Sequence, residues 1–283
     1  MKAVIWILAI SLVFNFVGLF FAYKYLKTRR RVAWVTQNFI QARGEYNRRF
    51  DRHMLFIHHS VGHNWLTEGN LKDSLESLGI GVHSATYGSD LGQDTDMSDW
   101  VPKFDRFSQK MLKYDIAPDI LYPDDTENGI IMFKPCFPNS DITSEGDPPG
   151  NPLSGELTIW NYKAVFEKLG EKFAKSPKEL YIYVTAPPLV PAQTSEDNAR
   201  RAREFNNWVK KDFVNEYRRN TGLSNLLVFD LFDLLADSTN CLRSEFRRSE
   251  NNSHPNAAGS LEATNRFLRF LRVQKVLKQD NIE

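Results

Sequence analysis

Short, continuous apolar runs alternate with helical patterns along most of this chain, and this alternation constrains the fold more than any other feature. The runs lie at residues 54–57, 130–133, 180–184 and 226–229, with a weaker one around 80–82, where two glycines dilute the signal. Strands that are buried on both faces have this continuous apolar character, and helices then cover both faces of the sheet. The sequence therefore predicts an α/β fold, a three-layer α/β/α domain with a mainly parallel five-stranded sheet.

The helical patterns between these runs predict the same fold. Residues 160–173 place apolar side chains at helical spacing, Ser195 is suited to cap a longer helix, and a last helix follows Pro255. Two long irregular segments, 87–105 and 140–156, follow predicted strands. Because loops at the ends of parallel strands form the walls of binding sites, we expect both segments near a site.

An almost wholly apolar segment, residues 3–23, precedes this domain. One serine and one asparagine are its only polar side chains. A helix of that length spans roughly 30 Å, the thickness of the hydrocarbon core of a bilayer. We expect one transmembrane helix that is retained as a single-pass anchor, with membrane lipid as its partner. The predicted division is an anchor (1–23), a basic juxtamembrane linker helix (24–53) and the α/β domain (54–283).

The charges that flank the apolar segment are asymmetric. Lys2 alone precedes it, whereas five basic residues follow, Lys24, Lys27, Arg29, Arg30 and Arg31. The positive-inside rule favours a cytoplasmic domain, although a two-residue N-terminal tail leaves the side of the membrane open. Over the whole chain 36 basic residues balance 35 acidic ones, for a formal net charge of +1. This balance gives no signature of nucleic-acid binding.

Three short segments contain residues that are suited to acyl transfer. Ser60 stands between a predicted strand and a predicted helix, Asn139 follows a strand, and His254 precedes the last helix. A serine is a poor nucleophile unless a base takes its proton, and a neutral histidine is the usual base. An amide such as that of Asn139 can donate to the oxyanion that then forms.

These segments resemble the sequence blocks of the SGNH/GDSL hydrolase superfamily over most of residues 54–272. Ser60 matches the nucleophile, Asn139 the oxyanion asparagine, and His254 in His-Pro-Asn-x-x-Gly the base. Gly88 is the better match for the second-block glycine, with Gly92 as the alternative.

The resemblance implies a flavodoxin-like fold without metal or cofactor. It also implies a serine esterase or deacylase, membrane-anchored here, that acts on O-acyl (acetyl) esters of a glycan or lipid. Ser60, Gly88 and Asn139 would form the oxyanion hole.

The blocks also depart from the family pattern. The family's Asp-x-x-His is Asn251-Asn-Ser-His254 here, so the usual carboxylate beside the base is missing. Asn251 has the family's spacing, and we predict that its amide oxygen accepts from the Nδ1–H of His254, with Glu250 as the alternative acid. Two other functions stay open, an acyltransferase in polysaccharide modification and a catalytically silent member that binds glycans or acts as a scaffold.

Four of the six histidines cluster in a short stretch, at His53, His58, His59 and His63. A zinc site is conceivable there, but no third ligand with suitable spacing is evident. We therefore interpret His58 and His59 as histidines packed at the end of a strand.

Overall fold

The structure is a computed structural model that describes residues 2–277, with the backbone alone for residues 2–20 and 22. The chain divides into two compact units, residues 1–48 and 49–283. In its described part the first unit is a single helix, α1 (Lys2–Asn47). The division into anchor, linker and domain stays a prediction.

The predicted anchor falls mainly on residues whose side chains lie outside the described set. Its backbone belongs to α1, which continues into the predicted linker as one helix. Within the residues that the structure describes, no helix is long and apolar enough to cross a membrane. The transmembrane helix therefore stays a prediction.

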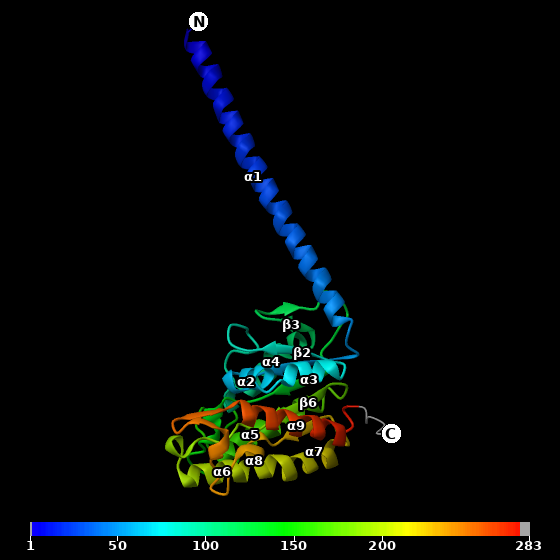
Figure 1. The fold of residues 1–283 in the computed structure, drawn as a ribbon, viewed down its shortest axis with the longest axis vertical. Helices are drawn as coiled ribbons and strands as arrows, with labels where there is room; N and C mark the ends of the chain where they lie inside the picture. The colour runs from blue at the N-terminus through cyan, green and yellow to red at the C-terminus, as the bar shows by residue number, and fades with distance from the viewer. Residues whose placement is uncertain (1, 278–283) are drawn as a thin grey trace. The chain divides into compact units, whose positions relative to one another are not determined.

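Five parallel strands form the central sheet of the second unit, in the order β2-β1-β5-β6-β7. Helices pack around this sheet (Figure 1). They are β1 (Arg52–Ile57), β2 (Ile80–Ala85), β5 (Ile130–Phe133), β6 (Leu180–Val184) and β7 (Leu226–Phe229). The predicted parallel sheet is confirmed, including its weak strand near residue 80. Leu55 and Ile57 enter the core on one face, whereas Met54 and Phe56 enter the core on the other. Burial on both faces explains why the strand sequences are continuously apolar.

Helices cover both faces of this sheet and complete the three layers. One layer comprises α2 (Ser60–Thr67), α3 (Leu71–Ser77), α8 (Leu231–Leu235) and α9 (Ala257–Val273). The other comprises α4 (Trp100–Lys113), α5 (Ile159–Phe173), α6 (Glu196–Asn207) and α7 (Val214–Thr221), with a π-helix (Trp208–Phe213) between the last two. Ser195 caps α6 as predicted, because its side chain accepts from the backbone N–H of Asn198.

Two small antiparallel hairpins were not predicted. One pairs β3 (Tyr114–Ile116) with β4 (Ile120–Leu121), and the other pairs β8 (Arg247–Ser249) with β9 (Asn252–Pro255). The second hairpin matters for function because β9 contains His254. Short 3-10 turns occupy Met97–Asp99, Phe137–Ser140, Pro191–Gln193 and Ser244–Phe246.

The strand order makes the region between the carboxyl ends of β1 and β5 the topological switch point of the sheet. The chain passes from β1 to β2 on one side and later returns to β5 on the other side of β1. The helix after β1, α2, covers one face of the sheet, and the helix after β5, α5, covers the other. Ligands of open α/β sheets bind where successive connections diverge in this way. Ser60 follows β1, and Lys134 follows β5.

Candidate active site

Ser60 is the first residue of α2, directly after the end of β1. His59 before it has an extended backbone, with φ −113° and ψ −155°. Gly62 lets the helix lie close against the strand end, because a Cβ at that position would lie 2.4 Å from the Cβ of His58. This close packing holds the half-buried Ser60 hydroxyl at the carboxyl edge of the sheet.

His254 approaches this hydroxyl from β9. Ser60 Oγ lies 2.7 Å from His254 Nε2. On the other side of the ring, Nδ1 lies 2.8 Å from Asn252 Oδ1. The same oxygen accepts from the backbone N–H of His254 at 3.0 Å. Since a backbone N–H only donates, this atom of the amide is its oxygen, and Nδ1 carries the ring hydrogen. Nε2 is then left to accept from the serine hydroxyl, as a general base must.

The supporting amide thus belongs to Asn252, which corrects the prediction for Asn251. Side chains alternate along a strand, so residues 252 and 254 share one side of β9. Asn251 precedes the strand and is exposed, and its backbone carbonyl accepts from Gln193 Nε2 at 2.9 Å. The carboxylate of Glu250 bonds to Arg247 at 3.2 Å, which does not bring it to His254.

The surroundings of His254 favour its neutral form. Burial lowers the pKa of the His254 imidazole, and the nearby charges of Arg248 and Lys134 lower it further. An aspartate in place of Asn252 would act in the opposite direction. His254 therefore holds an available lone pair on Nε2 at neutral pH.

Asn139 bonds to other parts of the chain in this structure, and its predicted role in the oxyanion hole stays a prediction. Its Nδ2 donates to Asp96 Oδ1 at 2.8 Å and to the carbonyl of Cys136 at 3.1 Å, and its Oδ1 accepts from the N–H of Met97 at 2.9 Å. An amide nitrogen has two hydrogens, so in this conformation neither is left for an oxyanion. Asn139 instead fastens its loop to the segment around residue 96.

Phe137 is the member of this loop that meets the proposed base. Its ring centroid lies 4.9 Å from that of His254, in an edge-to-face arrangement. The sequence does not predict this contact, because a single aromatic residue in a loop has no pattern that marks it as part of a site.

The loop after β2 adjoins the serine through His59. The His59 ring stacks on Tyr87 at 4.0 Å, and its Nε2 donates to the carbonyl of Gly92 at 2.8 Å. The N–H of Gly92 donates to Ser89 Oγ at 3.0 Å and is therefore occupied. Gly88 has φ +85°, a left-handed conformation that favours glycine, with open space where a Cβ would lie. The oxyanion roles of Gly88 and of the Ser60 N–H stay predictions.

The clustered histidines have separate hydrogen-bond partners. His58 donates from Nδ1 to the carbonyl of His59 and contacts Ser84 Oγ through Nε2, both at 2.8 Å. Its complete burial lowers its pKa to about 3. His53 lies 3.0 Å from His83 instead. Within the described part of the chain, no group of three or more His, Cys, Asp or Glu side chains is arranged to hold a metal ion.

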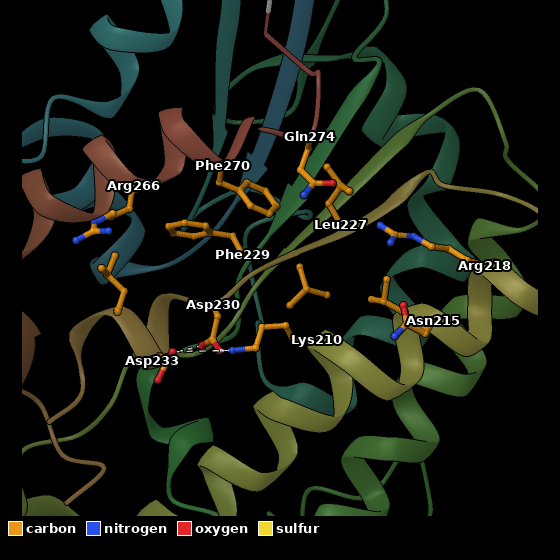
Figure 2. Close-up of a pocket in the computed structure, with 13 residues that line it drawn as sticks. Lys210, Asn215, Arg218, Leu227, Phe229, Asp230, Asp233, Arg266, Phe270 and Gln274 are labelled. Atoms are coloured by element: carbon orange, nitrogen blue, oxygen red, sulfur yellow. Dashed lines mark hydrogen bonds and ion pairs between the residues drawn. The ribbon is translucent and has the colours of Figure 1, made fainter. Parts of the chain in front are cut away.

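A cavity of about 460 Å³ lies beside the edge strand β7 (Figure 2). Its lining includes Phe229 of β7 and Phe270 of α9, and it contains none of the predicted site residues. Lys210 forms an ion pair there with Asp230, whose carboxylate also caps α8. These polar groups are engaged with one another, and we assign no function to the cavity.

The fold and the site together define the class of protein: an α/β chain with a serine–histidine pair at the carboxyl edge of a parallel sheet. No family model and no curated protein sequence matches the chain.

Several of the solved structures to which the chain is similar are GDSL-family proteins. One is a protein of the G-D-S-L family from Desulfitobacterium hafniense, with 17% identity, a TM-score of 0.44, and 77% of this chain and 99% of that chain covered. A GDSL-like lipase from Bacteroides thetaiotaomicron has 10% identity, a TM-score of 0.46, and 84% and 98% covered.

A family two carbohydrate esterase from Clostridium thermocellum, in complex with cellohexaose, has 10% identity, a TM-score of 0.43, and 80% and 65% covered. Identities and TM-scores this low do not establish an activity, which depends on the side chains of this chain itself.

Proposed function

We propose that this chain is a serine esterase of the SGNH type. The observation that carries the proposal is the 2.7 Å contact between Ser60 Oγ and His254 Nε2, with Nδ1 of the same ring bound to Asn252. This arrangement supports Ser60 as the nucleophile, His254 as the base and Asn252 as the group that orients the base.

The proposed reaction has two halves, acylation of Ser60 and hydrolysis of the acyl-serine. Ser60 Oγ bonds to the ester carbonyl carbon while its proton passes to His254 Nε2, and the carbonyl oxygen becomes an oxyanion. When this intermediate collapses, the ester C–O bond breaks and His254 returns the proton to the departing alcohol. Water then attacks the acyl-serine by the same route, with His254 as base, and releases the carboxylic acid.

In this mechanism the oxyanion lies near the start of α2. The N–H of Ser60, at the positive end of the helix dipole, is one proposed donor. The N–H of Gly88 is the second, because the corresponding N–H of Gly92 is occupied by Ser89.

We also propose an O-acyl ester of a glycan or a lipid as the substrate, and a chain held at a membrane by residues 3–23. The apolar length of that segment and the resemblance of the blocks around Ser60 and His254 support these assignments. The five basic residues after the segment favour a cytoplasmic domain.

A labelled fluorophosphonate tests the central assignment, because it reacts only with an activated serine. We expect the full chain to be labelled, and Ser60→Ala to abolish labelling. With a short-chain p-nitrophenyl ester, we expect kcat/KM to fall on the order of 10⁴-fold or more in Ser60→Ala, and similarly in His254→Ala, because the two residues act as a unit.

Ser249→Ala, on the exposed surface of the neighbouring β8, is the matched control and should retain full activity. A chain that is folded but neither labelled nor active would instead be a silent member of its class. Labelling that persists in Ser60→Ala would refute the assignment of the nucleophile.

A further inference from the structure

Lys134 follows β5, the strand next to β1, which leads to Ser60. It is the first residue after β5, and its backbone N–H donates to the carbonyl of Ile57 at 3.1 Å. Phe133 pairs with Ile57 in the sheet, so Lys134 lies opposite His58, two residues before Ser60. Because side chains alternate along strands, Lys134 follows Met132 onto the face of the sheet that α2 covers.

The ammonium of Lys134 is buried without a carboxylate partner. The side chain is only 1% exposed, and Nζ donates to the carbonyl of Pro135 at 2.6 Å. Among the described residues, no ion pair joins it to an acidic group. Burial lowers the pKa of Lys134 to about 8, while Cys136 acts in the opposite direction, so the side chain remains mostly charged at pH 7. Charges are seldom buried in proteins without a partner, because desolvation is costly.

Lys103 provides an internal comparison. It is also buried, and its Nζ donates to the carbonyl of Gln93 at 2.5 Å. Three carboxylates oppose the effect of burial on its pKa, those of Asp99, Asp94 and Asp90. Lys103 therefore has the compensation that Lys134 lacks.

The charge of Lys134 acts on the groups around Ser60. Burial is the largest cause that lowers the pKa of His58 and His59, which follow β1, and of His254 on β9, and the charge of Lys134 lowers each of them further. Other groups that act on these histidines lie on several elements: His63 on α2, Arg248 on β8, Lys103 on α4, and Asp96 before α4, which raises the pKa of His59. The charge of Lys134 itself disfavours an imidazolium and favours an anion.

We propose that the buried ammonium of Lys134 stabilises the anion that forms at Ser60 in the transition state. This inference rests on the proposed function and adds a buried cation to the predicted oxyanion donors. Lys134 acts through its field on the reacting atoms, and its burial strengthens this electrostatic interaction. Because no described carboxylate pairs with Lys134, its charge is available to a negative charge that forms only during the reaction.

The test compares Lys134→Met with Lys103→Met, two buried lysines changed to an apolar side chain of similar length. We expect Lys134→Met to lower kcat of ester hydrolysis about 10²-fold, as for a lost oxyanion donor. The imidazole NMR titration of His254 should move to higher pH, and the acid limb of kcat/KM should follow it. The acid limb moves to higher pH because removal of the cation makes His254 easier to protonate. Lys103→Met should leave the titration of His254 in place, and Lys134→Arg, which keeps the charge, should lie nearer to the wild type than Lys134→Met.

Circular dichroism and thermal melting establish that each variant is folded. An unchanged His254 titration or unchanged kcat in folded Lys134→Met would overturn the proposal, and so would equal effects in Lys103→Met. The NMR titration needs no turnover. If the wild-type chain proves neither labelled nor active, the proposed esterase fails, while the titration still reports whether Lys134 controls His254.

Discussion

The two ring nitrogens of His254 have different partners, and the difference determines what this site can do without a carboxylate. Asn252 accepts from Nδ1 and fixes both the tautomer and the ring orientation. An aspartate would also stabilise the imidazolium that forms in the transition state, which a neutral amide does far less. In the proposed mechanism Asn252 therefore supplies orientation, and charge stabilisation acts on the oxyanion instead.

Removing the acceptor tests this account of Asn252. In Asn252→Ala the ring loses the bond that fixes its tautomer, and we expect kcat/KM to fall about tenfold, the equivalent of about 1.4 kcal/mol. In Asn252→Asp we expect turnover to be preserved or raised. The new carboxylate also raises the pKa of His254, so the acid limb of the pH profile moves to higher pH.

Asn251→Ala is the matched control for this series, because Asn251 is the adjacent amide and its side chain has no described bond to His254. It should hydrolyse the ester like the wild type. If Asn251→Ala lost activity while Asn252→Ala kept it, the predicted family spacing would be right and the observed pairing would not describe the working enzyme.

At the scale of elements, the sequence predicted those parts of the site that local patterns define. The strand before Ser60 follows from an apolar run, and the last helix was predicted after Pro255, where it begins at residue 257. The partners of Asn139 could not be predicted. Asp96 and Met97 are more than forty residues away in an irregular segment, and their hydrogen bonds depend on tertiary structure. The single-residue shift from Asn251 to Asn252 arises from a hairpin whose short strands have no clear pattern.

The packing of α2 on β1 depends on Gly62, and Gly62→Ala tests it. Alanine normally stabilises a helix interior relative to glycine by roughly 0.5–1 kcal/mol. Here the added Cβ would lie 2.4 Å from His58 Cβ and Cγ, and His58 is fixed by its bonds to Ser84 and the carbonyl of His59. We therefore expect the helix to shift, with a loss of about 1–3 kcal/mol in the free energy of unfolding.

Urea unfolding and fluorophosphonate labelling of Gly62→Ala measure the two effects of that shift, since Ser60 begins the same helix. His63→Ala changes an exposed position of α2 and should leave labelling intact. A Gly62→Ala protein as stable and as reactive as the wild type would show that this contact does not position Ser60.

For the whole molecule, the order of the strands decides which predicted segments face one another. Apolar runs predict that strands exist, but their order β2-β1-β5-β6-β7 depends on how the connecting helices pack. Because β1 and β5 are neighbours, the first residues after the two strands lie at the same edge of the sheet, and these include His58, Ser60 and Lys134. Asn139 comes later, in a 3-10 turn that has already left the strand end. The sequence predicts that polar residues follow these strands. The topology shows which of them lies at the strand end beside β1, namely Lys134, and which lies further along the loop, namely Asn139.

The last prediction concerns the two units and the membrane. Both core clusters of the second unit consist of residues between 54 and 277, so residues 49–283 should fold alone. We expect this fragment to leave the membrane fraction on expression and to retain fluorophosphonate labelling, while the full chain stays with membranes after an alkaline carbonate wash. Leu12→Arg in the full chain is the point-variant counterpart, because an arginine at the centre of a spanning segment costs roughly 2.5–3.5 kcal/mol. It should weaken membrane retention without reducing labelling, and a control change at Gln37, beyond the apolar segment, should do neither. A full chain that washes off as readily as the fragment would show that residues 3–23 do not anchor it.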